Sequence, residues 1–168
     1  VHVFQDDKND DTPDSIFPNN WVSFHENGDV GLYPMYAKNR RLERRPEVLE
    51  FLESEGFTIS NIVDYSSAES EDKFLEGTGS MILDRENRVA YCSISNRSNE
   101  DLFIEFCEDF EFTPVLFNSF QSVGDKRLPI YHTNVMMCIA SDYVIVCLDS
   151  VDDKKQRKNV SNFINNTG

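Results

Sequence analysis

The stretch WVSFHENGDVGLY, residues 21–33, has the pattern of a β-hairpin. Residues 21–24 and 30–33 are strand-like, and the ENGD segment between them contains the Asn-Gly pair that favours hairpin turns. We therefore expect two antiparallel strands here. This hairpin is the first part of a pattern that recurs along the chain.

A helix and a further strand are predicted after this hairpin. The helix begins near Pro46, because proline suits the first turn of a helix, and Gly56 closes it. Apolar residues between these two positions recur at helical spacing. Residues 57–63 then return as a strand, so the predicted unit has the order strand, strand, helix, strand.

The same order of elements recurs further along the chain. The predicted elements lie at 80–83, 89–94, 99–110 and 114–117 in the second unit, and at 134–139, 143–148 and 152–164 in the third. The hairpin turns follow one another at roughly 55–60 residues, a regular spacing that indicates a structural repeat. Residues 2–4 would be the last strand of a preceding unit. We therefore expect about three units of a longer, radially repeated protein.

The composition describes a soluble globular chain of 168 residues, with 39% hydrophobic and 27% charged residues. The chain has 16 Lys+Arg against 30 Asp+Glu, and its formal net charge of −14 argues against nucleic acids and anionic membranes as partners. No apolar run approaches the roughly 20 residues that span a bilayer. The four cysteines lack C-x-x-C spacing and lie in apolar stretches, so we expect a reduced, cytoplasmic protein.

Unusual polar residues lie where one unit joins the next. Asn20 lies in TPDSIFPNNW, Glu76 in LEGTGS, and His132 and Asn134 in YHTN. Each segment also has an ordinary structural interpretation. The first is a turn-rich loop, the glycines of the second allow a close backbone approach, and a single histidine in a buried strand is commonly a hydrogen-bonded core residue. No helix is expected after the glycine-rich segment, so it is a weak candidate for a phosphate loop.

Arginines form a second group of candidates. Arg97 follows the second hairpin, and the densest basic cluster of the chain consists of Arg40, Arg41, Arg44 and Arg45. Part of this cluster is also explained as a solvated approach to a helix, with nearby glutamates as partners. Guanidinium groups bind carboxylates in a bidentate manner, so arginines at the joins suit a ligand that carries a carboxylate.

Taken together, four segments resemble the pentein superfamily of guanidine-modifying enzymes. They are TPDSIFPNNW (12–21), LYPMYAKNRRLERR (32–45), FLEGTGSMILDR (74–85) and YHTNVMM (131–137), and they are most similar to the citrulline-utilisation hydrolases related to arginine deiminases and amidinotransferases. The resemblance implies an α/β propeller of five strand-strand-helix-strand modules. About three of these modules are expected within residues 1–168, which would form a single, partial domain.

The resemblance also implies a catalytic mechanism. It assigns His132 as the general acid and base and Glu76 as its acidic partner, together with a nucleophilic cysteine. None of the four cysteines matches the family's nucleophile segment, so we expect the nucleophile beyond residue 168 and no activity from these residues alone. We expect no cofactor and no metal, because the three histidines lack ligand spacing.

The resemblance places the substrate among five polar residues. Arg97 matches an arginine that holds a substrate carboxylate, and Arg41, with Arg40 as the weaker match, lies in an arginine-rich site loop. Asn20 and Asn134 stand where guanidine-specific relatives carry aspartate. An amide suits the neutral ureido group of citrulline better than an anion does, so we predict the hydrolysis of citrulline to ornithine. Arginine deiminase or amidinotransferase chemistry, or a non-catalytic binding module, are the alternatives.

Overall fold

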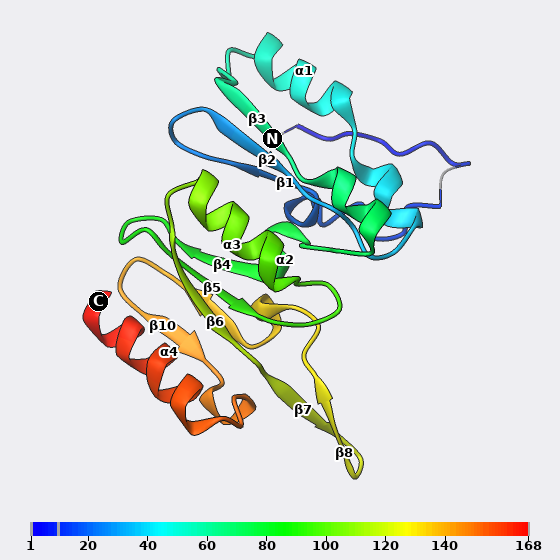
Figure 1. Ribbon diagram of the computed structural model, residues 1–168. Helices are drawn as coiled ribbons and strands as arrows, with labels where there is room; N and C mark the ends of the chain where they lie inside the picture. Colours follow the sequence, from blue (N-terminus) through cyan, green and yellow to red (C-terminus); the bar gives the residue numbers. More distant parts are fainter. Residues whose placement is uncertain (1, 10, 168) are drawn as a thin grey trace.

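The computed structural model describes residues 2–9 and 11–167. Its first unit has the predicted order. Strand β1 (Val22–Phe24) pairs antiparallel with β2 (Asp29–Leu32), helix α1 (Pro46–Ser54) follows, and β3 (Asn61–Asp64) pairs parallel with β2 (Figure 1). Gly28 in the β1–β2 turn has a φ of +87°, a backbone conformation that favours glycine. The hairpin and the helix of this unit are therefore confirmed, and the third strand is shorter than predicted.

The second unit repeats this topology. Strand β4 (Met81–Asp84) pairs antiparallel with β5 (Val89–Ser93), and β6 (Thr113–Phe117) pairs parallel with β5 after helix α3 (Glu100–Asp109). The side chain of Asn99 caps α3 by accepting a hydrogen bond from the next turn at 3.1 Å. Local signals of turn and cap therefore fix this unit much as the sequence predicts.

The third unit consists of a hairpin and a helix in the described part of the chain. Strand β9 (Met137–Ile139) pairs antiparallel with β10 (Val144–Val146), and α4 (Lys154–Thr167) follows. The prediction of a strand at residues 2–4 is wrong, because these residues have no regular secondary structure. The segment is held by side chains instead: the Phe4 ring packs edge-on against Phe51 of α1, with a centroid distance of 5.3 Å.

Several short elements were not predicted from the sequence. The hairpin of β7 (Phe120–Val123) and β8 (Lys126–Pro129) is almost entirely exposed, so it lacks an alternating apolar pattern. The other unpredicted elements are the helical turn α2 (Gly77–Ser80) and the 3-10 helices η1 (Pro18–Asn20), η2 (Asn39–Glu43), η3 (Ser66–Glu71), η4 (Thr133–Val135) and η5 (Leu148–Ser150).

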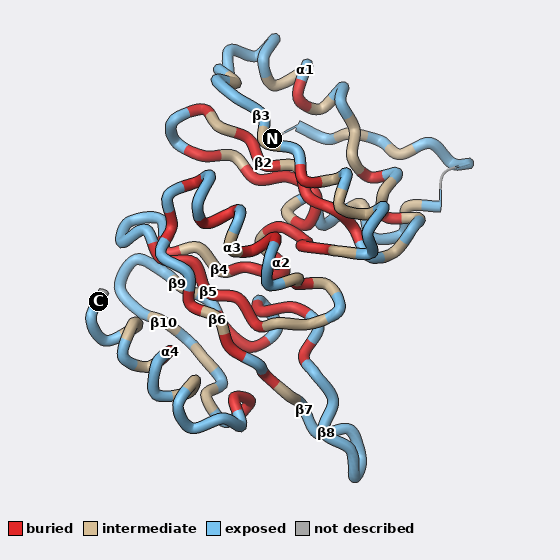
Figure 2. Tube along the Cα trace, viewed as in Figure 1, coloured by how far each residue is buried: buried red, intermediate tan, exposed pale blue. Residues whose placement is uncertain are grey.

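The core is built around the two three-stranded sheets, with α3 between them (Figure 1). Strand β5 is buried along its whole length (Figure 2). Its alternate residues Ala90 and Cys92 face α3, whereas Val89 and Tyr91 belong to the cluster that includes residues of α4. A third cluster joins the first sheet to α1. In the described part of the chain, no helix is long and apolar enough to cross a membrane.

Candidate active site

Three short elements meet around the glycine-rich segment, and each carries a predicted site residue. Asn20 ends η1, Glu76 is the N-cap of α2, and His132 is the N-cap of η4. The glycine at position 79 permits this approach, because a Cβ there would overlap the Asn20 amide nitrogen and lie 3.0 Å from His132 Nδ1. As expected, a strand and not a helix follows this segment, since β4 begins at Met81; the segment itself forms α2, one helical turn that contacts both η1 and η4.

Glu76 and His132 form a buried pair. Glu76 is 0% exposed, and its Oε2 lies 2.6 Å from His132 Nε2, while its Oε1 accepts a hydrogen bond from the Tyr36 backbone N–H at 3.0 Å. Burial opposes ionisation, but the His132 and Tyr36 hydrogen bonds and the Arg97 charge hold the pKa of Glu76 below its usual value. An ionised Glu76 accepts a hydrogen bond from the Nε2–H group of His132, which leaves Nδ1 of the neutral imidazole as its basic nitrogen.

Arg40 fixes the position of Asn20. The Arg40 guanidinium is 4% exposed and binds both carboxylate oxygens of Glu43 at 2.9 Å, while its Nη1 donates to Asn20 Oδ1 at 2.9 Å. Burial would lower the pKa of Arg40, but the hydrogen bond and the charge of Glu43 raise it above its ordinary value. Because Oδ1 of Asn20 accepts from Arg40, the amide NH₂ is the group of Asn20 that remains for a ligand.

Arg97 contacts the Glu76 carboxylate oxygen that the Tyr36 N–H does not bind. Its Nη1 is 3.3 Å from Glu76 Oε2, and its guanidinium lies 5.6 Å from the ring centroid of Tyr36 and 5.2 Å from that of Tyr131. These aromatic contacts restrain the guanidinium plane without using its N–H groups. Arg97 therefore keeps donors free for an anionic group of a ligand.

Most of the predicted site residues line one cavity of about 250 Å³. Asn20, Arg40, Arg97, His132 and Asn134 line it, and Glu76 lies behind His132. Asn134 belongs to the 3-10 helix η4 and is exposed, so the expectation that His132 and Asn134 enter a buried strand is wrong.

Arg41 does not line this cavity. Its Nε donates to the Met35 carbonyl at 3.1 Å and lies 3.4 Å from a carboxylate oxygen of Glu69. Neighbouring residues of a 3-10 helix point about 120° apart, so one arginine of the pair faces the site and the other faces away. The structure brings Arg40, the weaker match, into the cavity.

Sequence reasoning missed four lining residues, Asp14, Phe17, Asn19 and Tyr131. All four belong to segments that were singled out, TPDSIFPNNW and YHTNVMM, but Asn20, Asn134 and the histidine carried the inference. Tyr131 is 45% exposed and directly precedes His132, so an exposed aromatic residue beside a candidate catalytic residue was the available signal.

The four cysteines lie outside the cavity. Cys92 and Cys107 are buried, and burial raises the pKa of the Cys107 thiol to about 12. Cys138 and Cys147 are exposed on the third unit, and Cys147 lies just after β10 rather than within a strand. Among the described residues, no group of three or more His, Cys, Asp or Glu side chains is placed to hold a metal ion.

Solved structures with the same fold include those of ArgZ and AgrE. The chain is 22% identical to apo ArgZ, an arginine dihydrolase from the ornithine-ammonia cycle in cyanobacteria, over 92% of this chain and 22% of that one, with a TM-score of 0.67. It is 22% identical to the N-terminal domain of ArgZ bound to substrate, over 90% of this chain and 51% of that domain, at a TM-score of 0.66.

AgrE in complex with ornithine and NAD⁺ is a further neighbour, at 21% identity and a TM-score of 0.65, over 90% of this chain and 20% of AgrE. At these identities the similarity shows the fold, and the chain spans about a fifth of the length of ArgZ and AgrE. Comparison with curated protein sequences finds no match.

A family model described as N,N dimethylarginine dimethylhydrolase, eukaryotic, matches residues 1–168. The chain belongs to this family and is therefore a member of the pentein superfamily, as its sequence motifs indicate. Enzymes of this family hydrolyse C–N bonds of guanidino compounds. The closer likeness to citrulline-utilisation hydrolases remains a prediction.

Proposed function

We propose that this chain carries the acid–base residues and the substrate carboxylate site of a pentein hydrolase that acts on citrulline. The observation that carries the proposal is the buried Glu76–His132 pair, with 2.6 Å between Oε2 and Nε2, at the wall of a cavity that arginines also line. A histidine held by a buried carboxylate is suited to general acid–base catalysis, because the carboxylate fixes its tautomer and stabilises the imidazolium.

In the proposed reaction, the thiol of a cysteine supplied by another part of the protein gives its proton to neutral His132, and the thiolate attacks the ureido carbon of citrulline. The bond from this carbon to the side-chain nitrogen breaks, and that nitrogen takes the proton from the His132 imidazolium to give ornithine. His132 then removes a proton from water as the water oxygen attacks the carbonyl carbon of the S-carbamoyl intermediate. The C–S bond breaks and the thiolate leaves, and the carbamate that is released decomposes to ammonia and CO₂. Glu76 remains ionised throughout, since its pKa is held low by the same hydrogen bonds.

Asn20 supports a neutral substrate. Arg40 binds its Oδ1 at 2.9 Å, so Asn20 offers an N–H donor, which matches the carbonyl oxygen of a ureido group. A guanidinium group has no acceptor for this donor. Arg97 has free donors for the carboxylate of the amino-acid substrate, and such paired N–H groups bind a carboxylate strongly.

A second candidate is the hydrolysis of a guanidino substrate such as arginine or dimethylarginine. The Asp14 carboxylate lines the same cavity and would attract a guanidinium cation. The relatives described above, an arginine dihydrolase and a dimethylarginine dimethylhydrolase family, have guanidino substrates. In either reaction the units would be modules of a five-fold α/β propeller, a proposal that the repeated topology of the first two units supports.

The test is an assay of the full-length gene product with citrulline, arginine and dimethylarginine as substrates, in which ornithine, citrulline and ammonia are followed. Citrulline should be the fastest substrate, and faster turnover of arginine or dimethylarginine would overturn the ureido specificity in favour of the second candidate. His132→Gln should abolish turnover, whereas the matched control His2→Gln, in the exposed N-terminal segment, should not change it. Binding without turnover of any substrate would instead indicate a non-catalytic module.

A further inference from the structure

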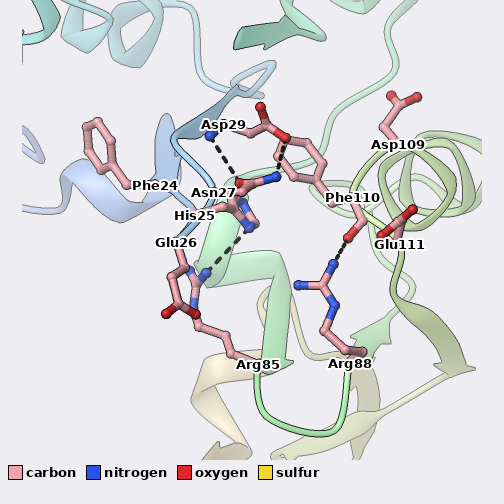
Figure 3. Close-up of a pocket in the computed structure, with 10 residues that line it drawn as sticks. All are labelled: Phe24, His25, Glu26, Asn27, Asp29, Arg85, Arg88, Asp109, Phe110 and Glu111. Carbon is pink, nitrogen blue, oxygen red and sulfur yellow. Dashed lines mark hydrogen bonds between the residues drawn. The ribbon is translucent and has the colours of Figure 1, made fainter. Parts of the chain in front are cut away.

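A second cavity, of about 870 Å³, lies between the β1–β2 turn, the β4–β5 turn and the C-terminal end of α3 (Figure 3). It shares no lining residue with the candidate active site. Arg85 and Arg88 of the β4–β5 turn and His25 at the end of β1 are among the residues that line it. We call it the seam cavity, because it lies where the first unit meets the second.

Arg85 and Arg88 differ from the other arginines of the chain in their charge pairing. Seven of the nine arginines have a carboxylate oxygen within 4.0 Å. Among the described residues, Arg85 and Arg88 alone have none, although both belong to a chain of net charge −14. Two unpaired cations in one cavity of an acidic protein are an unusual arrangement, and they offer a place for an external anion.

Neutral groups hold both guanidinium groups in place. Arg88 donates to the Phe110 carbonyl, and its guanidinium lies 4.2 Å from the ring centroid of Phe112. Arg85 Nη1 lies 3.4 Å from His25 Nδ1. These partners orient the two side chains and leave their charges uncompensated, so most of the N–H groups stay available to a carboxylate.

His25 is a buried histidine in the lining of the seam cavity. Its ring stacks on Phe110 with a centroid distance of 4.2 Å, and its Nε2 lies 3.0 Å from the Ser23 hydroxyl. Burial lowers the pKa of His25 to about 4, with further lowering by Arg85 and Arg88 and an opposing effect of Asp29. His25 is therefore neutral at neutral pH, which suits Nδ1 as the acceptor of the Arg85 hydrogen bond.

Acidic side chains also line the same cavity. Figure 3 shows the Asp29 and Asp109 carboxylates on one side of the cavity and the Arg85 and Arg88 guanidinium groups on the other. Glu26 and Glu111 complete a set of four carboxylates in the lining. Because the carboxylates outnumber the arginines, the lining disfavours polyanions such as nucleic acid and favours a ligand that also brings positive charge.

We propose that the seam cavity binds a small basic amino acid, with the ligand carboxylate between Arg85 and Arg88 and the ligand ammonium groups facing Asp29 and Asp109. This site is separate from the candidate active site and does not depend on the proposed function. Each end of the ligand meets the opposite charge: a carboxylate accepts paired hydrogen bonds from guanidinium groups, and an ammonium group donates to the aspartates.

The three histidines of the chain allow a direct test by NMR. His25 lines the seam cavity, His132 lines the candidate active site, and His2 lies in the exposed N-terminal segment. L-Lysine is the probe, because it carries a carboxylate and two ammonium groups but no guanidino or ureido group. It should produce a saturable shift of the His25 ring resonances and no shift of those of His2. Shifts confined to His132 would overturn the seam proposal and leave the proposed function standing.

Two further comparisons test the charges that the proposal invokes. Cadaverine lacks the carboxylate of lysine and glutarate lacks its ammonium groups, so both should bind about tenfold or more weakly than lysine. Arg85→Gln and Arg88→Gln should each weaken lysine binding by a similar factor, and the control Arg127→Gln, at an exposed ion pair with Asp152, should leave it unchanged. Equal binding of lysine and cadaverine, or equal binding by the variants, would refute the proposal.

Discussion

The substitution Glu76→Gln tests the central pair of the candidate site. Glu76 is 0% exposed and its Oε2 accepts hydrogen bonds from His132 and Arg97, whereas Oε1 accepts from a backbone N–H. Glutamine keeps the size and one acceptor but removes the negative charge that Arg97 faces at 3.3 Å and Arg40 at 3.9 Å. Loss of one partner of a buried charged group typically costs about 3–5 kcal/mol, and glutamine retains part of the hydrogen bonding, so we expect a loss of about 3 kcal/mol.

The pH dependence of this loss has a defined sign. The pKa of Glu76 is lowered in the folded state, so its ionised form stabilises the fold above the unfolded value of 4.5, and this contribution disappears as the pH falls through the folded value. The stability difference between the wild type and Glu76→Gln should therefore be largest near neutral pH and should shrink below about pH 4. Burial alone would raise this pKa and would give the opposite trend.

The measurement is urea unfolding of both proteins, followed by far-UV circular dichroism at about pH 7 and about pH 3.5. The m-value should be the same for the two proteins, so that the midpoint reports stability. In the full-length enzyme the same variant should lower kcat by about 100-fold or more, because the amide no longer fixes the His132 tautomer. A stability loss below about 0.5 kcal/mol at neutral pH would refute the proposed electrostatic role of Glu76.

Three further predictions follow from other contacts. Ser23→Ala removes the hydroxyl 2.6 Å from the buried Tyr33 hydroxyl and should cost about 2–4 kcal/mol in urea unfolding, whereas a similar cost for the exposed control Ser122→Ala would contradict this reasoning. Gly79→Ala places a Cβ 3.0 Å from His132 Nδ1 and should abolish turnover in the full-length enzyme while its circular dichroism spectrum stays native; unchanged kcat would exclude the crowding argument. Asn20→Asp should shift the ratio of kcat/KM values from citrulline towards arginine by about tenfold or more, and an unchanged ratio would remove Asn20 as the specificity residue.

Local signals account for the parts of the fold that the sequence predicts. The Asn-Gly turn, Pro46 at the start of α1 and the Asn99 cap of α3 act within a few residues, so their effects can be recognised without tertiary information. The β7–β8 hairpin has no such pattern, because its strands are almost entirely exposed. The expected strand at 2–4 failed for a different reason: apolar residues also pack as isolated side chains, as Phe4 does on Phe51.

The site is harder to predict because its residues come from distant segments. Glu76 and His132 lie 56 residues apart in the chain, and the His132 ring packs so closely on α2 that a Cβ at position 79 would lie 3.0 Å from its Nδ1. The family resemblance, and not spacing or periodicity, singled out this pair. The seam cavity had no sequence motif, since its two arginines differ from the others in having no carboxylate oxygen within 4.0 Å among the described residues, which only the three-dimensional arrangement reveals.

Arg40 and Arg41 show that a correctly recognised motif does not by itself identify which of its residues face the cavity. The arginine-rich segment is shared by Arg40 and Arg41, and nothing in the sequence says which of them faces the cavity. In the structure Arg40 is held by both oxygens of Glu43, and this fixed guanidinium determines that Asn20 accepts through Oδ1 and presents its NH₂ group. The specificity proposed for Asn20 therefore depends on Arg40 as much as on Asn20 itself. An aspartate at position 20 would also accept from Arg40, but it would present a second carboxylate oxygen to the substrate where the asparagine presents a donor.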